Sequence, residues 1–237
     1  MLQQTQVKTV IPYYGRWLKV FPTLESLAKA PLERIYKLWE GLGYYSRARN
    51  LKKGAEYIQE KLGGKFPNTR EGLLEIPGVG PYTAGAIASI AFQRGESLVD
   101  GNVGRVFARL FEIPGIWNEP KTNQKLWGKA REILSQKHPG DFNEALMELG
   151  ATVCTKDSPL CSACPLSKFC LAFQKGTIHR YPTTKKSNIE KVEKVTLLIR
   201  KNGKVLVRRK KLGRIMGGLW EFPTIKKPAS SHCEAKP

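Results

Sequence analysis

The stretch EIPGVGPYTAGAIA, residues 75–88, places a tight glycine turn directly before a run of small residues. Gly78 and Gly80 allow backbone angles that other residues avoid, and they let the main chain approach a partner closely. The small residues predict a helix over 82–94, whose unpaired N–H groups would point at whatever lies above the turn. The pattern is that of a phosphate-binding corner, and also that of an ordinary helix–turn–helix connection without a ligand.

Helical patterns extend from this corner in both directions, up to about residue 175. Apolar residues recur every three or four positions over 2–20, which predicts an amphipathic helix. Thr23 is the expected N-cap of the next helix, and Pro31 opens the one after it. Further helices are expected over 46–64, 68–76, 100–112, 121–137 and 142–153. Because no strand pattern is convincing before residue 190, residues 1–175 are predicted to form an all-α domain.

The chain changes character after residue 175. Residues 176–190 are polar and basic and are interpreted as a linker. Residues 191–237 carry two β-rich runs around Asn202-Gly203, the strongest short-range signal for a hairpin. They are predicted to begin a second, strand-containing domain that stops early, because a two-stranded hairpin is marginal alone.

The charge balance points to a polyanionic partner. The chain holds 40 Lys and Arg against 20 Asp and Glu, a net charge of +20, of which residues 176–237 carry +12. Such an excess repels itself in a compact protein, so nucleic acid is the natural partner, with a merely soluble basic protein as the alternative. No stretch approaches the ~18 apolar residues of a membrane span, and the first residues lack the features of a signal peptide. A cytoplasmic, nucleoid-associated location is therefore expected.

Four of the five cysteines fall close together, in the spacing C-x6-C-x2-C-x5-C formed by Cys154, Cys161, Cys164 and Cys170. Four thiolates in a short loop can surround a Zn²⁺ ion or an iron–sulfur cluster. Zinc sites usually have two C-x2-C pairs, whereas the single pair here favours the larger cluster. A disulfide framework would need an oxidising compartment.

A carboxylate follows the glycine corner by about 20 residues. Asp100, in LVDGNVGRV (98–106), comes after an apolar pair and just before an expected helix. It is expected to cap that helix, and a carboxylate held at the edge of a DNA cleft is compatible with the same position.

The glycine corner, Asp100 and the cysteine spacing, in this order, resemble the helix-hairpin-helix DNA glycosylases with an iron–sulfur loop, and among them the MutY-type adenine glycosylases. The resemblance runs from residue 1 to about 225. The stretches that carry it are MLQQTQV (1–7), LWEGLGYYSRARNL (38–51), IPGVGPYTAGAIASIAF (76–92), LVDGNVGRV (98–106), FNEALMELGATVCT (142–155) and CSACPLSKFC (161–170).

The resemblance implies a mainly α helix-hairpin-helix glycosylase fold that holds a [4Fe–4S] cluster and excises adenine mispaired with 8-oxoguanine or guanine in double-stranded DNA. A related family, endonuclease III, has a lysine nucleophile at the position of Tyr82. Tyrosine cannot form that imine, so Tyr82 favours a glycosylase that leaves the DNA strand intact. An endonuclease III-like lyase and a non-catalytic mispair-binding protein stay open as alternatives, and a monomer is expected.

Several further residues receive roles from the resemblance. Asp100 matches the carboxylate that stabilises the oxocarbenium-like sugar, and Tyr82 stands at the position that decides the chemistry. Glu144 matches a residue that contacts the flipped adenine. Residues that wedge into the duplex or touch the opposite base are matched by Gln4, Thr5, Leu42 and Tyr44. Leu42 and Tyr44 could instead be packed in the core, and Gln4 and Thr5 could instead lie on a solvated helix face.

The chain also departs from the family pattern. The family's catalytic acid is a glutamate two residues before the position of Met1, so the resemblance implies a chain truncated at both ends. Loss of a general acid typically costs ~10²–10⁴-fold in rate, so nearly no excision is expected. Residues 205–224 resemble the opening of a Nudix-like domain without its carboxylate box, which implies no nucleotide hydrolysis. Little preference for A·8-oxoguanine over A·G is expected.

Overall fold

A computed structural model describes the chain, which is mainly helical, as the sequence predicts. The described residues are 1–2, 5–117, 119–183, 192–212 and 216–226. Gln4 therefore lies outside the described residues, and so does Cys233. None of the described helices is long and apolar enough to cross a membrane.

Packing divides the chain into two compact units. Unit 1 combines residues 1–22, 30–50 and 187–237. Unit 2 combines residues 23–29 and 51–186. The helix α4 (Tyr45–Lys61) contributes residues to both units. The division predicted from sequence, with a helical domain over 1–175 and a linker over 176–190, stays a prediction.

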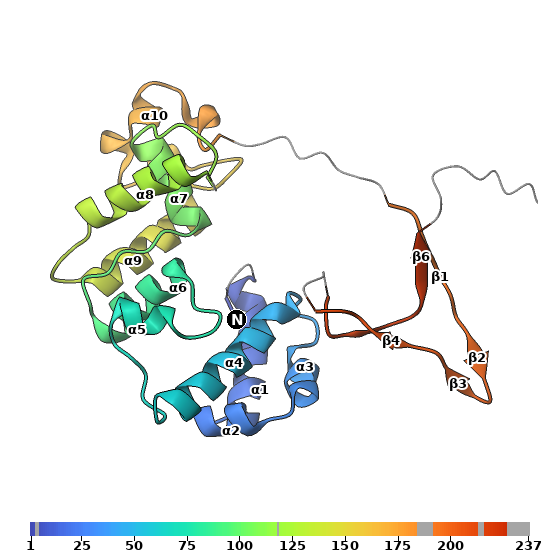
Figure 1. The fold of residues 1–237 in the computed structure, drawn as a ribbon. Helices are drawn as coiled ribbons and strands as arrows, with labels where there is room; N and C mark the ends of the chain where they lie inside the picture. Colours follow the sequence, from blue (N-terminus) through green and yellow to red (C-terminus); the bar gives the residue numbers. More distant parts are fainter. Residues whose placement is uncertain (3–4, 118, 184–191, 213–215, 227–237) are drawn as a thin grey trace, which may run out of the picture. The chain divides into compact units, whose positions relative to one another are not determined.

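In unit 1, α1 (Val7–Val20) packs on α3 (Leu32–Trp39) through aromatic side chains (Figure 1). Trp17 meets Phe21 and Trp39 edge to face, with ring centroids 5.0 and 5.6 Å apart. Aromatic pairs prefer this geometry because the positive edge of one ring faces the negative face of the other. These rings form the buried centre of the helical part of unit 1.

The C-terminal residues of unit 1 form three antiparallel strand pairs. The hairpin predicted at Asn202-Gly203 is confirmed, because both residues adopt positive φ angles, 50° and 71°, between β2 and β3. Such angles are required by the tight turn that matches the twist of paired strands. The paired strands are β1 (Lys194–Thr196) with β6 (Thr224–Lys226), β2 (Arg200–Lys201) with β3 (Lys204–Val205), and β4 (Arg208–Arg209) with β5 (Trp220–Glu221). The Nudix-like interpretation of this region stays a prediction.

Unit 2 contains most of the helices, in the order shown in Figure 1. Its α-helices are α2 (Leu24–Lys29), α5 (Arg70–Leu74), α6 (Pro81–Ala86), α7 (Gly101–Leu110), α8 (Pro120–Glu132), α9 (Pro139–Glu148) and α10 (Leu171–Gln174). Its other helical segments are η1 (Ile87–Ala91), η2 (Leu149–Val153), η3 (Cys161–Ala163), η4 (Ser167–Phe169) and η5 (Ile178–Arg180). The expected N-cap at Thr23 is confirmed, since its hydroxyl accepts a hydrogen bond from the Ser26 N–H. Thr69 caps α5 in the same way, by accepting a hydrogen bond from the Gly72 N–H.

The helices of unit 2 surround an apolar core centred on α7. Val103 and Phe107 of α7 are fully buried against Leu98 and Leu126. A buried polar link holds α9 to η1: the amide of Asn143 donates to the Ser89 hydroxyl and to the Glu96 carbonyl, both at 2.9 Å. Buried polar groups with all partners in place fix the relative position of the elements they join.

Two helices differ from the sequence prediction. The expected helices over 82–94 and 142–153 both end in π-helical turns, η1 and η2. In each turn a hydroxyl bonds the carbonyl four residues earlier: Ser89 to Gly85 and Thr152 to Glu148, both at 2.8 Å. A hydroxyl in this position competes with the backbone N–H for that carbonyl, which explains the wider turn.

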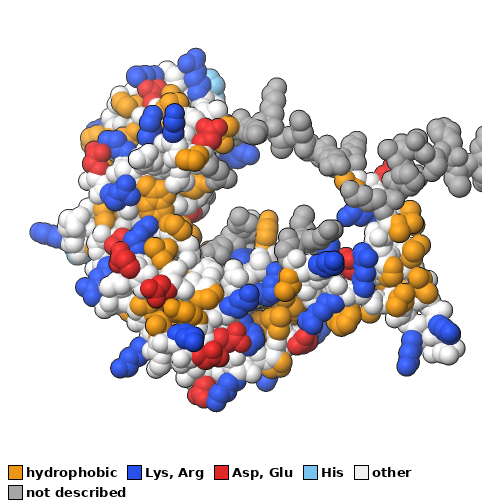
Figure 2. Space-filling model, viewed as in Figure 1, with side chains coloured by type: hydrophobic (Ala, Val, Ile, Leu, Met, Phe, Trp, Pro, Cys, Tyr) orange, Lys and Arg blue, Asp and Glu red, His pale blue; other side chains and the backbone are white. Residues whose placement is uncertain are grey.

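Basic side chains cover both the helical and the strand-forming regions. Figure 2 shows Lys and Arg side chains distributed over the whole visible face, with Asp and Glu between them. Several ion pairs of the described residues are exposed on both sides, such as Lys29–Glu25, Lys37–Glu40 and Lys129–Glu132. Such pairs contribute little to stability, so the excess positive charge remains available to an anionic partner.

Candidate functional site

The glycine turn forms as the sequence predicts, between α5 and α6. Gly78 has a φ of 86°, in the region that favours glycine. Gly80 is the N-cap of α6, with a φ of −97° and a ψ of 178°, and Pro81 begins the helix. The expectation of an unusual backbone angle at Gly80 is therefore wrong, because an N-cap has extended backbone that any residue adopts. A side chain at Gly80 would meet no atom within 4 Å, so the main chain there is open to a close partner.

Tyr82 lies in the first turn of α6 and is half-buried against the α7 core. Its hydroxyl donates a hydrogen bond to the sulfur of Met147, 3.5 Å away. Burial, and secondly the negative charge of Asp100, raise the pKa of the Tyr82 phenol. The phenol is therefore neutral at physiological pH, and can donate a hydrogen bond.

Asp100 is the N-cap of α7, as expected. Its Oδ1 accepts a hydrogen bond from the Val103 N–H at 2.7 Å. Tyr82 packs against the apolar core that contains α7, the helix that Asp100 caps, so the two residues that the sequence singled out for chemistry lie in the same part of unit 2. One carboxylate oxygen is committed to the cap, and the second is the one a substrate could approach.

The helix α9 supplies Glu144 and Met147, one turn apart. Glu144 is exposed, and Met147 is half-buried at the Tyr82 hydroxyl. Residues three apart on a helix share one face, so Glu144 lies on the face of α9 that meets Tyr82. Sequence reasoning missed Met147, although its spacing from Glu144 could have pointed to it.

The remaining predicted contact residues belong to unit 1. Leu42 is 6% exposed, which corresponds to the core-packing alternative, whereas Tyr44 is 64% exposed. Thr5 is half-buried, and its hydroxyl accepts a hydrogen bond from Arg47 at 3.2 Å. Arg47 was not singled out in the sequence, where a basic residue in a helix looks like part of a solvated face.

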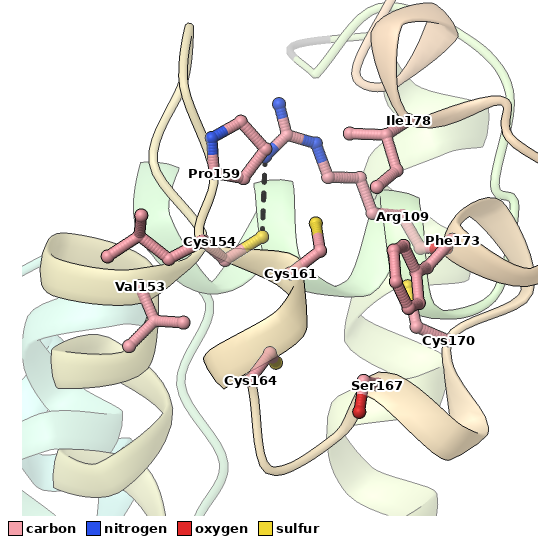
Figure 3. A pocket seen from close by; sticks show the side chains of 11 residues that line it. Arg109, Val153, Cys154, Pro159, Cys161, Cys164, Ser167, Cys170, Phe173 and Ile178 are labelled. Atoms are coloured by element: carbon pink, nitrogen blue, oxygen red, sulfur yellow. Dashed lines mark hydrogen bonds between the residues drawn. The ribbon is translucent and has the colours of Figure 1, made fainter.

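The four cysteines Cys154, Cys161, Cys164 and Cys170 line one small cavity in unit 2, of about 30 Å³ (Figure 3). All four are free, so the disulfide alternative is not realised in the described residues. The Arg109 guanidinium, buried at 4% exposure, donates to the Cys154 sulfur at 3.4 Å. The Cys170 thiol donates to the Arg109 carbonyl at 3.6 Å.

The four thiols can be compared with the requirements of a metal centre. Burial raises the pKa of the Cys161 and Cys170 thiols, so nearby positive charge is needed to hold them as thiolates. A tetrahedral zinc ion at about 2.3 Å from each sulfur would need the four sulfurs within about 4 Å of one another. Among the described residues, no three Cys, His, Asp or Glu side chains are grouped closely enough to hold one metal ion. The four thiols therefore share one cavity without being arranged around a single ion.

Two arginines of α7 anchor the cysteine segment. Arg105 donates to the backbone carbonyls of Cys154 and Gly150, at 2.8 and 2.7 Å. Arg109 also donates to three carbonyls of the chain around the cavity, those of Thr155, Lys156 and Tyr181, at 2.6 to 3.0 Å. These arginines were missed in the sequence, because nothing in their spacing marks Arg109 as buried or Arg105 as half-buried.

Comparison with known proteins agrees with this geometry. Residues 1–132 match the HhH-GPD family, described as a superfamily of base excision DNA repair proteins. The chain is 54% identical over 176 residues to the adenine DNA glycosylase of Homo sapiens, a match that covers 74% of this chain and 32% of that protein. The chain thus spans about a third of the length of its mammalian relatives, 32% to 34%.

Two solved structures share the fold. A thermostable thymine-DNA glycosylase is 31% identical with a TM-score of 0.66, and the match covers 73% of this chain and 80% of that one. A trapped endonuclease III–DNA covalent intermediate is 26% identical with a TM-score of 0.64, and the match covers 74% and 81%. The helical architecture described above is therefore that of a known group of DNA-acting proteins.

Proposed function

Because this chain belongs to the HhH-GPD superfamily of base excision DNA repair proteins, we propose that it acts on DNA as an adenine glycosylase. The reaction is hydrolysis of the bond between adenine and deoxyribose, in adenine paired with 8-oxoguanine or guanine. The substrate follows from the relatives, which are named adenine DNA glycosylases. The observation that carries the proposal is that Tyr82, in the first turn after the glycine corner, packs against the apolar core that contains α7, the helix capped by Asp100.

The chemistry assigns a separate role to each of these two groups. When the glycosidic bond breaks, its electron pair leaves with adenine, and positive charge develops on the sugar. The Asp100 carboxylate, fixed by the Val103 N–H, would stabilise that charge. The Tyr82 side chain carries a hydroxyl group and no amine, so it cannot form an imine with the sugar. Water completes the hydrolysis: its oxygen bonds to the sugar carbon and its proton is taken up by the released adenine, and the strand stays intact.

Recognition of the flipped adenine is assigned to α9. Glu144 is exposed on the helix face that meets Tyr82. Its carboxylate can accept a hydrogen bond from the exocyclic amine of adenine. Flipping costs a few kcal/mol and costs less for a mispaired base, which favours a mispair as substrate.

Contacts to the rest of the duplex are assigned to both units. Gly78 and Gly80 would bring backbone N–H groups to a phosphate. In unit 1, the exposed Tyr44 suits insertion between bases, and Leu42 and Thr5 would support it. The role of Gln4 stays a prediction that concerns a residue outside the described ones.

A [4Fe–4S] cluster is the proposed cofactor, held by Cys154, Cys161, Cys164 and Cys170. The shared cavity lined by all four cysteines and the membership in a family of DNA glycosylases support a cluster. When bound, the cluster would cross-link the cysteine segment and supply a redox-active centre. Arg109 would donate a charge-assisted hydrogen bond to one of its thiolates.

Binding tests the proposal without depending on turnover. Fluorescence anisotropy would compare duplexes that contain one A·8-oxoguanine, A·G or A·T pair, with the 237-residue chain. We expect the two mispairs to bind about tenfold more tightly than A·T, a difference of about 1.4 kcal/mol. Borohydride should trap no adduct. Equal binding to all three duplexes, or a trapped adduct, would overturn the proposal.

The role of Asp100 has its own test. A duplex with a cationic pyrrolidine in place of the target sugar mimics the developing charge, and a neutral tetrahydrofuran site is its matched control. The chain should bind the cationic site more tightly. D100N keeps an N-cap acceptor but removes the charge, so it should lose that difference while binding the neutral site as before. An unchanged difference in D100N would exclude this role.

A further inference from the structure

Arg47, in the first turn of α4, joins two segments of unit 1 that are separate in sequence. One guanidinium nitrogen donates to the Met1 carbonyl at 3.0 Å. The other donates to the Thr5 hydroxyl at 3.2 Å, to the Leu42 carbonyl at 3.0 Å and to the Gly43 carbonyl at 3.5 Å. A single side chain therefore ties the N-terminal segment to the loop before α4.

Two aromatic rings also contact this guanidinium. Its carbon lies 5.3 Å from the ring centroid of Trp39 and 5.5 Å from that of Tyr44. Trp39 is 1% exposed, and Tyr44 is 64% exposed. The buried ring thus fixes the guanidinium, and the guanidinium in turn holds the exposed ring.

The loop over residues 41–44 needs such support because its backbone is strained. Gly41 and Gly43 have φ angles of 96° and 67°, and Tyr44 has a φ of 45°, which non-glycine residues seldom adopt. The Trp39 indole N–H donates to the Gly43 carbonyl at 2.9 Å, and the backbone N–H of Arg47 donates to the Tyr44 carbonyl at 2.9 Å. Without the Arg47 side chain, the Leu42 carbonyl would lose a donor two residues before Tyr44, while the Gly43 carbonyl would keep the Trp39 indole.

From this geometry we infer that Arg47 is a positioning residue for recognition of the base opposite the target. It holds Thr5, Leu42 and Tyr44 in one arrangement, and it makes no direct contact with DNA. This rests on the proposed function, which assigns those three residues to the duplex.

The inference separates Arg47 from the other basic residues of the chain. An arginine that binds a phosphate contributes to affinity for every duplex and to its salt dependence. The Arg47 guanidinium donates its hydrogen bonds to acceptors within the protein. Its loss should therefore reduce discrimination between base pairs and leave the salt dependence of DNA binding unchanged. Lysine keeps the charge but lacks the planar fork that reaches several carbonyls and stacks on rings.

The test compares R47K with R34K in the full 237-residue chain. Arg34 is exposed and touches one ring, that of Phe21 at 5.8 Å, so R34K is a matched change at a site without the network. Anisotropy would measure affinity for A·8-oxoguanine and A·T duplexes over a range of salt. We expect R47K to lose most of the roughly tenfold mispair preference, with A·T affinity and salt slope unchanged. R34K should keep the preference.

Three outcomes would overturn the inference. The first is that R47K keeps the mispair preference. The second is that R47K binds all duplexes equally more weakly, with the slope of log affinity against log salt reduced by about one, as expected for a side chain that binds a phosphate. The third is unchanged hydrogen exchange in the peptide over 40–46 of R47K, which would show that the loop does not depend on Arg47. T5V removes only the hydroxyl acceptor and should cause a smaller loss in the same direction, so the network can be tested even where R47K is poorly folded.

Failure of the proposed function has a different signature. Wild-type protein without any mispair preference would contradict the proposed function and remove the basis of this inference with it. Wild-type preference that persists in R47K would contradict the inference alone.

Discussion

The Tyr82 hydroxyl donates a hydrogen bond to the Met147 sulfur, 3.5 Å away, and thereby joins α6 to α9. A thioether is a weak acceptor, so the phenol is oriented without being strongly held. The same phenol feels the charge of Asp100 at the start of α7. Three helices thus converge on one side chain, and the first prediction concerns its titration.

Y82F should change the alkaline part of the stability profile. A phenol whose pKa is raised in the folded state keeps its stabilising effect below its usual pKa of about 10, and loses it as pH rises through the higher folded value. Wild-type protein should therefore lose stability steadily above about pH 10, and Y82F should lose less. Urea unfolding at neutral and alkaline pH measures this. At neutral pH, loss of the hydrogen bond should lower the unfolding free energy by about 1 kcal/mol. Parallel pH profiles for the two proteins would contradict the prediction.

R109Q should destabilise unit 2 strongly. Arg109 is buried and donates to three carbonyls and one sulfur, and glutamine cannot replace those donors. Breaking a buried charged network typically costs about 3 kcal/mol or more. Urea unfolding measures the loss, and R131Q, at an exposed position of α8, is the control that should change it little. Equal stability of the two variants would show that the network contributes nothing.

The cysteine centre predicts a metal content. Protein purified without oxygen should be brown, with about four irons per chain and no stoichiometric zinc. C164S removes one proposed ligand and should lower the iron content sharply, whereas C233S alters a cysteine outside the proposed set and should keep it. Colourless protein with one zinc per chain would contradict the cluster and indicate a zinc site in its place.

Two glycine substitutions should have opposite effects. A side chain at Gly85 would overlap the Ser97 carbonyl oxygen, so G85A should destabilise the protein by about 2 kcal/mol or more. Gly128 lies inside α8 with no atom within 4 Å of an added methyl group, so G128A should stabilise it by about 0.5–1 kcal/mol. Thermal and urea unfolding of the two variants would check the pair, and a stable G85A would show that the helix can move away.

Local signals in the sequence were sufficient for much of the fold. The N-caps Thr23 and Asp100, the turn at Gly78 and the hairpin at Gly203 were all found where expected. Each depends on one or two residues whose chemistry acts within four positions, so no tertiary contact is needed to predict it.

Features that depend on distant partners could not be predicted in this way. The hydrogen-bond networks of Arg47 and Arg109 involve acceptors far along the chain, such as Met1 and Tyr181. The backbone at Gly80 is extended, which any residue can adopt. The presence of glycine at this position therefore led to the wrong prediction of an unusual φ angle. The pairing of Met147 with Tyr82 spans two helices, and only the register of α9 hinted at it.

The π-helical turn η2 ends directly before Cys154, the first of the four cysteines. Such a turn holds one residue more than an α-helical path of the same rise, and each residue rotates a helix by about 100°. Deleting a single residue near Thr152 would therefore rotate the Cys154 thiol by about 100°, away from the cavity that it shares with the other three cysteines. The number of residues in η2 thus sets the direction of the Cys154 thiol. A one-residue deletion there should lower the iron content as much as replacing Cys154 itself.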